Sequence, residues 1–215
     1  MIPKRSPETV LEQEVQGNSG KYTLRKRSGQ ITCNCPSFVN RGYCWHTSMW
    51  EGPPEARYPR KKIQVLIAIL SQALRPLVQK YEVAGSFRRL KPEIRDVDIL
   101  VSVREARWPI LKQELEKQGM SFFVVGDRVM RGTFREVNFD IYRADKGEWA
   151  AFLLFLTGSG PFNIRLRAMA KKKGFKLNQY GLFTRDSDMK IPTPTEASIF
   201  KELGLMYIAP ENREQ

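Results

Sequence analysis

The segment 83–101 constrains the fold most, because it places two carboxylates at the head of an apolar run. Asp96 and Asp98 are two residues apart at the start of a strand predicted over 97–103. Side chains alternate along a strand, so both carboxylates face the same side. Two like charges held this close repel each other, and a divalent cation relieves the repulsion. Oxygen ligands favour Mg²⁺ or Mn²⁺, although an isolated Asp-x-Asp pair is more often a solvated strand edge.

Neighbouring residues favour the metal-binding interpretation over the solvated edge. Gly85-Ser86 follows a short strand predicted at 83–84, and a tight turn there would expose backbone N–H groups to a phosphate. Arg88 and Arg89 come next and could neutralise phosphate charge. The combination predicts a catalytic phosphate and metal site.

A third carboxylate, Asp140, completes the ligand set of a two-metal site. In the strand predicted over 133–142, the apolar side chains of 137, 139 and 141 share one face. Asp140 lies on the other face. It can therefore join Asp96 and Asp98 if the two strands are neighbours.

The remaining pattern predicts an α+β or α/β protein with strands and helices mixed along the chain. Helices are predicted from residue 61, over 108–118, 148–156 and 161–173, and after a capping box at Thr193–Glu196; further strands are predicted over 122–125 and 177–183. A linker rich in proline, residues 51–60, separates this part from a unit at 21–50, and residues 1–20 are predicted to be a loose leader.

A net charge of +13 over 215 residues favours a polyanionic partner, with nucleic acid first and a generally basic soluble protein as the alternative. The chain has no run of 18 apolar residues and no secretory signal, which predicts a protein that is not secreted and has no membrane partner. We expect it in the cytoplasm, or in the nucleus if the host has one.

From residue 61 to the C-terminus the sequence resembles the family X DNA polymerases of the nucleotidyltransferase superfamily. The motifs that carry the resemblance are Gly85-Ser-Phe-Arg-Arg89, Asp96-Val-Asp98, Phe155-Leu-Thr-Gly-Ser-Gly-Pro-Phe-Asn163, and the segments 170–183 and 195–210. The resemblance implies a palm over 61–145, a nucleotide-selecting thumb subdomain over 146–215, and template-directed addition of dNTPs to a primer 3′-hydroxyl on gapped or primer-template DNA.

The resemblance also implies roles for individual residues. Asp96 and Asp98 would bridge two Mg²⁺ (or Mn²⁺) ions, and Asp140 would bind the ion that activates the primer hydroxyl. The expected nucleotide contacts are Gly85, Ser86, Arg89, Thr157, Gly158, Ser159 and Asn163, with a cis peptide at Gly158-Ser159. The expected DNA contacts are Arg167, Lys171, Lys172, Lys173 and Lys176, for which a solvated helix face is the alternative.

The chain departs from the family pattern at several positions. Arg95 replaces the glycine common before Asp-x-Asp, Asn138 replaces a basic residue, Phe155-Leu156 replaces a Tyr-Phe pair that excludes ribonucleotides, and Gly160-Pro161 is atypical. No motif of a lyase domain precedes the palm, so we expect no 5′-deoxyribose phosphate lyase activity.

The N-terminal unit gathers all three cysteines and the single histidine as Cys33-x-Cys35-x₈-Cys44-x-His46. Three thiolates and one imidazole form a normal tetrahedral ligand set for Zn²⁺. The alternative is that these residues are redox-active or simply buried thiols. The spacing resembles a SWIM zinc finger over residues 20–50, a module associated with binding DNA or protein. Nearby basic residues favour DNA contacts, with a protein partner as the alternative.

Two other functions compete with the templated polymerase. One is a template-independent nucleotidyltransferase that tails a nucleic-acid end or modifies another substrate, and Asn163 and Arg167 argue against it. The other is a DNA-binding adaptor without catalysis, and the complete set of three aspartates argues against that.

Overall fold

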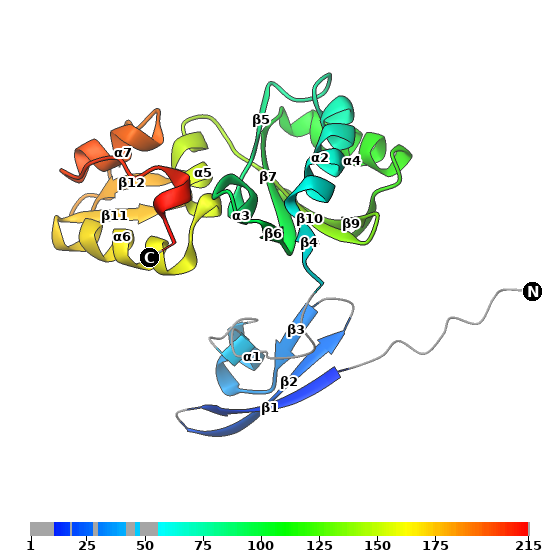
Figure 1. Cartoon of the computed structure of the whole chain (residues 1–215). Coiled ribbons are helices and arrows are strands. Elements are labelled where there is room, and N and C mark those ends of the chain that lie inside the picture. Colours follow the sequence, from blue (N-terminus) through cyan, green and yellow to red (C-terminus); the bar gives the residue numbers. More distant parts are fainter. Residues whose placement is uncertain (1–10, 18, 28–29, 42–45, 48–55, 215) are drawn as a thin grey trace, which may run out of the picture. The chain divides into compact units, whose positions relative to one another are not determined.

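A computed structural model describes residues 11–17, 19–27, 30–41, 46–47 and 56–214. The chain divides into two compact units, Met1–Ala56 and Arg57–Gln215, and each is described by itself (Figure 1).

The N-terminal unit contains an antiparallel sheet in the order β1-β2-β3, followed by a short helix. Its elements are β1 (Leu11–Gly17), β2 (Gly20–Arg27), β3 (Gln30–Cys33) and α1 (Pro36–Arg41). The small core is formed by Val15, Leu24, Cys33 and Cys35. The loose leader predicted over residues 1–20 is therefore too long. Its second half is a polar strand, held by pairing with β2 and by a 2.7 Å ion pair between Arg25 and Glu12.

In the N-terminal unit β2 and β3 pair antiparallel, and residues 28–29 between them lie outside the described residues. Residues 58–60, predicted as linker, belong instead to the second unit, where β4 (Tyr58–Pro59) pairs with β6 (Glu93–Ile94) and α2 begins.

A five-stranded sheet in the order β5-β7-β10-β9-β8 forms the centre of the second unit. Its strands are β5 (Lys80–Val83), β7 (Asp96–Ser102), β8 (Ser121–Val125), β9 (Val129–Phe134) and β10 (Val137–Arg143). Only the central pair among these, β7 and β10, is parallel. One face of the sheet packs on α2 (Arg60–Leu74) and α4 (Trp108–Lys117), which follows the short turn η2 (Glu105–Arg107).

The strand predicted over 133–142 is two strands, β9 and β10, joined by a two-residue turn. Arg135 and Glu136 adopt φ values of +48° and +72°, the left-handed conformation that a tight hairpin turn requires. Because glycine or asparagine is usual in such a turn, the residues Arg135 and Glu136 do not predict it. The predicted strand over 177–183 is likewise a hairpin of β11 (Phe175–Asn178) and β12 (Gly181–Thr184).

The C-terminal part of the second unit has its own core around α5, α6 and α7. Its elements are α5 (Trp149–Thr157), α6 (Gly160–Lys172), β13 (Lys190–Ile191), α7 (Glu196–Glu202) and η3 (Pro210–Asn212), with β11-β12-β13 as a small sheet. Apolar side chains of α5 also pack on Leu100 of β7, joining this part to the central sheet. None of the helices in the described part of the chain is long and apolar enough to span a membrane.

The capping box of α7 begins two residues later than predicted. Thr195, not Thr193, is the N-cap: its hydroxyl accepts from the backbone N–H of Ser198 at 3.1 Å, and the Ser198 hydroxyl accepts from the Thr195 N–H at 3.1 Å. Glu196 therefore takes no part in the capping box, and its side chain is buried.

Candidate active site

The sheet register brings the predicted carboxylates to one level. In the parallel pair of β7 and β10, Asp98 is the partner of Asp140, and Asp96 is the partner of Asn138. The alternate residues of both strands, such as Val97 and Phe139, are buried against α2 and α4. The three aspartates therefore lie on the opposite face of the sheet, as the alternation of the two strands predicts.

The electrostatics of this face reflect concentrated negative charge. Burial, together with the charges of Asp96 and Asp140, raises the pKa of Asp98 from 3.8 to about 7, against the opposing effect of Arg89 and Arg95. Burial also raises the pKa of Asp140, although Arg131 and the Tyr142 hydroxyl oppose this shift. A cation at this face would restore the charged forms of both carboxylates.

Two arginines lie beside the carboxylates. Arg95, which stands where a glycine is common, donates to Asp96 Oδ2 from Nε at 3.0 Å and from its terminal nitrogen at 2.8 Å. Arg131 of β9 lies with Nε 3.2 Å from Asp140 Oδ2. Arg131 is not among the predicted site residues, because its place opposite Asp140 depends on the unpredicted turn at 135–136.

Gly85 begins the short helix α3 (Gly85–Arg88) directly against Asp98. Its φ is +58°, and an added Cβ would collide with Asp98 Oδ2. Backbone N–H groups in the first turn of a helix have no intrahelical partner, so those of Gly85 and Ser86 remain as donors beside the carboxylates. Only glycine allows this close approach.

Arg88 and Arg89 point to different partners. Arg88 makes a two-pronged bond with Glu196, at 2.9 and 2.6 Å, and also donates to the Thr157 hydroxyl at 2.8 Å. Fully buried Arg213 donates to the same carboxylate at 2.8 Å. Burial alone would raise the pKa of Glu196, but the bonds from the two arginines lower it. The suggestion that Arg88 contacts phosphate does not agree with this buried network.

Arg89 remains close to the carboxylates and is covered by the C-terminal segment. It donates to Glu214 Oε1 at 2.5 Å and to the carbonyl of Thr157. Lys91 pairs with the other oxygen of Glu214 at 2.9 Å. The Glu214 carboxylate therefore pairs with the guanidinium of Arg89, which the family resemblance implies would contact phosphate.

The turn at 157–159 joins α5 to α6 beside Arg89. The peptide bond between Gly158 and Ser159 is cis, as the resemblance implies. The Ser159 hydroxyl caps α6 and donates to the carbonyl of Arg213 at 2.7 Å. Asn163, one turn into α6, donates to the carbonyl of Phe155 at 2.7 Å.

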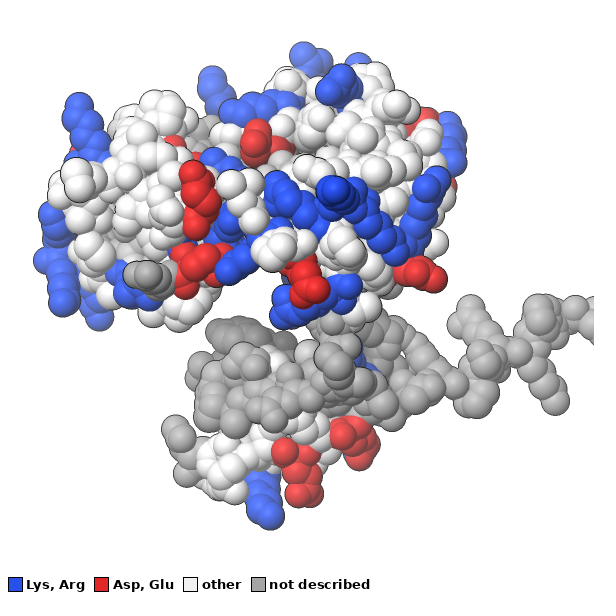
Figure 2. All heavy atoms as spheres, viewed as in Figure 1, with Lys and Arg blue, Asp and Glu red and all other residues white. Residues whose placement is uncertain are grey.

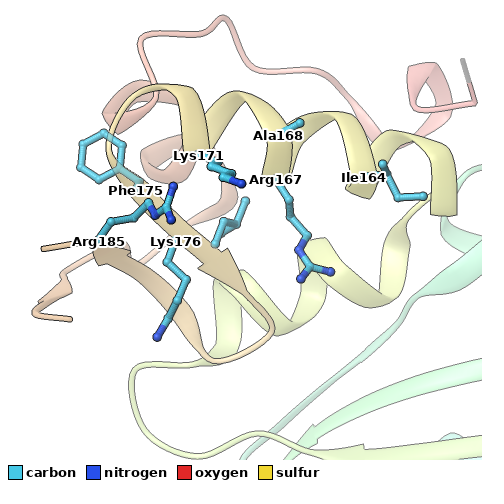
Figure 3. A pocket seen from close by; sticks show the side chains of 8 residues that line it. Ile164, Arg167, Ala168, Lys171, Phe175, Lys176 and Arg185 are labelled. Atoms are coloured by element: carbon cyan, nitrogen blue, oxygen red, sulfur yellow. The ribbon is translucent and has the colours of Figure 1, made fainter. Parts of the chain in front are cut away.

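A basic groove lies between α6 and β11, with a volume of about 490 Å³. It is lined by Arg167 and Lys171 of α6, by Lys176 of β11, and by Arg185 from the chain after β12 (Figure 3). Phe175 and Ile164 supply apolar surface. Of the predicted DNA contacts, Lys172 and Lys173 are exposed but do not line this groove. Arg185 was not predicted, because it reaches the groove through the β11–β12 hairpin, which the sequence pattern suggested to be a single strand.

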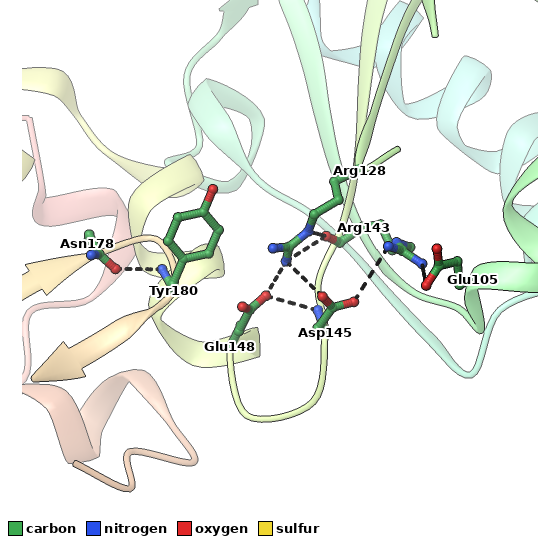
Figure 4. Close-up of polar contacts among 7 residues, drawn as sticks. All are labelled: Glu105, Arg128, Arg143, Asp145, Glu148, Asn178 and Tyr180. Atoms are coloured by element: carbon green, nitrogen blue, oxygen red, sulfur yellow. Dashed lines mark hydrogen bonds and ion pairs between the residues drawn. The ribbon is translucent and has the colours of Figure 1, made fainter. Parts of the chain in front are cut away.

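Figure 2 shows basic side chains distributed over one face of the second unit, with acidic ones between them. Figure 4 shows one cluster in which basic and acidic side chains pair directly. There Arg128 pairs with Glu148 and, at 3.6 Å, with Asp145, while its guanidinium lies 5.2 Å from the ring centre of Tyr180. This cluster links the β8–β9 turn to the C-terminal core.

In the N-terminal unit, Cys33, Cys35 and His46 are all buried, and their ligand atoms lie within 4.8 Å of one another. Backbone N–H groups of Cys35 and Phe38 point at the sulfurs of Cys33 and Cys35, at 3.4 and 3.3 Å. The fourth predicted ligand, Cys44, lies outside the described residues.

Comparisons with known proteins agree with this architecture. The family described as DNA polymerase beta thumb matches residues 152–214. Repair DNA polymerase X of African swine fever virus (isolate Pig/Kenya/KEN-50/1950) is 33% identical over 151 residues, which cover 66% of this chain and 86% of the viral protein. DNA polymerase lambda of Rattus norvegicus is 31% identical over 193 residues, 74% of this chain and 33% of that protein. From its sequence, its thumb and its relatives alike, this chain belongs to the family X DNA polymerases.

Proposed function

We propose that this chain is a template-directed DNA polymerase that adds nucleotides to a primer 3′-hydroxyl and fills short gaps in DNA repair or end joining. The observation that carries the proposal is the register that sets Asp98 beside Asp140, with Asp96 on the same face. The relatives named repair DNA polymerase X and DNA polymerase lambda support the same reaction.

Asp96, Asp98 and Asp140 would hold two divalent cations, Mg²⁺ or Mn²⁺, because carboxylate oxygens suit a hard cation. A cation would also offset the burial and the charge repulsion that raise the pKa values of Asp98 and Asp140. Such ions neutralise the charge that develops during phosphoryl transfer and favour the ionised attacking hydroxyl. Arg95 competes for Asp96, so metal binding would turn that carboxylate away from the guanidinium.

The incoming triphosphate would lie between α3 and the turn at 157–159. The N–H groups of Gly85 and Ser86 donate to its oxygens, and the Arg89 guanidinium exchanges Glu214 for phosphate. Thr157, Gly158 and Ser159 would flank the sugar. Asn163 would release the Phe155 carbonyl and turn toward the edge of the base.

Template DNA would follow the basic groove. Arg167, Lys171 and Lys176 supply positive charge for the phosphates, and Arg185 extends the row. Phe175 offers an apolar surface beside them. Lys172 and Lys173 are exposed on the same stretch but outside the groove, so they would attract the DNA phosphates more weakly.

The N-terminal unit would bind one Zn²⁺ through Cys33, Cys35, Cys44 and His46. The convergence of three of these ligands in a buried cluster supports the proposal, because thiolate and imidazole together are the preferred zinc donors. We assign the finger to DNA contact, as its SWIM-like spacing and basic residues suggest, and a protein partner is the alternative outcome.

The test is extension of a primer across a one-nucleotide gap, with each dNTP and rNTP offered singly in Mg²⁺ or Mn²⁺. We expect incorporation of the dNTP complementary to the template, and none by Asp140→Ala. Addition regardless of the template base would establish the tailing alternative. Absence of any addition by the wild-type protein would refute a polymerase function.

A further inference from the structure

Arg131 stands in the same row of side chains as the carboxylates. In the antiparallel pair of β9 and β10 it is the direct partner of Asp140, which is in turn the partner of Asp98 on β7. Its neighbours in β9, Met130 and Phe134, are buried in the core, so Arg131 belongs to the face that carries the aspartates. The sheet thus fixes the order carboxylate, carboxylate, guanidinium across three strands.

From this geometry we propose that Arg131 is a positioning residue of the polymerase reaction, which holds one oxygen of Asp140 and leaves the other for the metal and primer hydroxyl. The inference rests on the proposed function. It assigns to β9, a strand outside the recognised motifs, a part in the active site.

The contacts on Asp140 are one-sided. Arg131 Nε lies 3.2 Å from Oδ2, and the Tyr142 hydroxyl donates to the same Oδ2 at 3.1 Å. Among the described residues, neither a hydrogen bond nor an ion pair joins Oδ1. A hydrogen bond and an ion pair on the same oxygen restrain that edge of the carboxylate and leave Oδ1 available for a cation.

The contact contributes more to orientation than to stability. The Arg131 side chain is 48% exposed, and ion pairs with this exposure contribute little to folding. Asn138, exposed two residues before Asp140 on the same face, is uncharged, and Arg95 is already bonded to Asp96. Arg131 is therefore the charged side chain placed to hold Asp140.

The experiment measures single-turnover gap filling at saturating dNTP and DNA. Arg131→Ala is compared with Arg131→Lys and with Arg107→Ala, an exposed arginine on η2 that matches the loss of charge. We expect Arg131→Ala to lower the maximal rate at least tenfold, with the KM for dNTP and the Kd for DNA within twofold of wild type. Lysine should recover part of the rate, and Arg107→Ala should leave it unchanged.

Two readouts separate positioning from a structural effect. The loss should be smaller in Mn²⁺ than in Mg²⁺, because Mg²⁺ demands near-ideal octahedral geometry. Adding Asn138→Arg to Arg131→Ala should restore part of the rate, since position 138 lies on the same face one pleat away. The Tm of Arg131→Ala should stay within about 2 °C of wild type, as for other exposed ion pairs.

The inference is overturned if Arg131→Ala fills gaps at the wild-type rate, if it weakens only DNA binding, or if its Tm falls in parallel with its rate. A wild-type protein that adds no nucleotide would instead refute the proposed function itself. The two failures are therefore distinguishable in one set of assays.

Discussion

Replacing Asp98 with asparagine should stabilise the metal-free protein while abolishing its activity. The folded chain raises the pKa of this carboxyl from 3.8 to about 7, because it is buried beside Asp96 and Asp140. Between these two values the folded protein binds more protons than the unfolded chain. The free energy of unfolding therefore falls as the pH rises through this interval.

The size of the effect follows from the shift. Each pKa unit corresponds to about 1.4 kcal/mol, so ionised Asp98 costs about 4 kcal/mol above pH 7, of which about 3 kcal/mol accrues between pH 5 and pH 8. Asparagine is nearly the same size and does not ionise. The advantage of Asp98→Asn over wild type should therefore grow by about 3 kcal/mol from pH 5 to pH 8.

Urea unfolding in EDTA at the two pH values measures this difference, with Asp127→Asn, an exposed aspartate, as the control. Millimolar Mg²⁺ should reduce the wild-type loss at pH 8, because a bound cation offsets the repulsion. An advantage of Asp98→Asn that is equal at pH 5 and pH 8 would contradict the reasoning. It would mean that neither burial nor the two neighbouring carboxylates raise the pKa of Asp98.

Three further predictions concern other parts of the chain. Gly85→Ala places a methyl group against Asp98 at a positive φ, so gap-filling activity should fall at least a hundredfold, with about 1–2 kcal/mol lost in urea unfolding; unchanged activity would show that the turn moves freely. Glu196→Gln removes the charge shared by two arginines and should destabilise the protein by about 3 kcal/mol, whereas a loss below about 1 kcal/mol would mean that water already reaches them. Elemental analysis should find one zinc per chain, lost in His46→Ala, and a metal-free wild-type protein would exclude the zinc finger.

The sequence predicted the central strands and the face on which the aspartates lie, because alternation in β7 and β10 is local information. It did not predict Arg131. That contact depends on a turn at Arg135-Glu136 with two positive φ values, which these residue types do not signal. One residue of error in such a turn reverses the face of every side chain in the following strand.

The partners of Arg88 could not be predicted from the sequence either. Arg88 and Arg89 are adjacent and chemically identical, and which of them faces the carboxylates depends on the rotation of the short helix α3. Glu196, which accepts from Arg88, and Arg213, which donates to the same carboxylate, both lie more than a hundred residues away from it. Long-range charge pairing of this kind leaves no periodic pattern, whereas a capping box or an apolar stripe does.

The pairing of Glu214 with Arg89 and Lys91 gives the protein a competitor on its own chain. A carboxylate tethered this near acts at a high effective concentration, so a free anion must displace it before it can bind the guanidinium. A ligand with a single phosphate gains little by that exchange. A metal-bound triphosphate gains contacts along several oxygens, so the tail would act as a threshold that favours the polyanion over the many smaller phosphates of a cell.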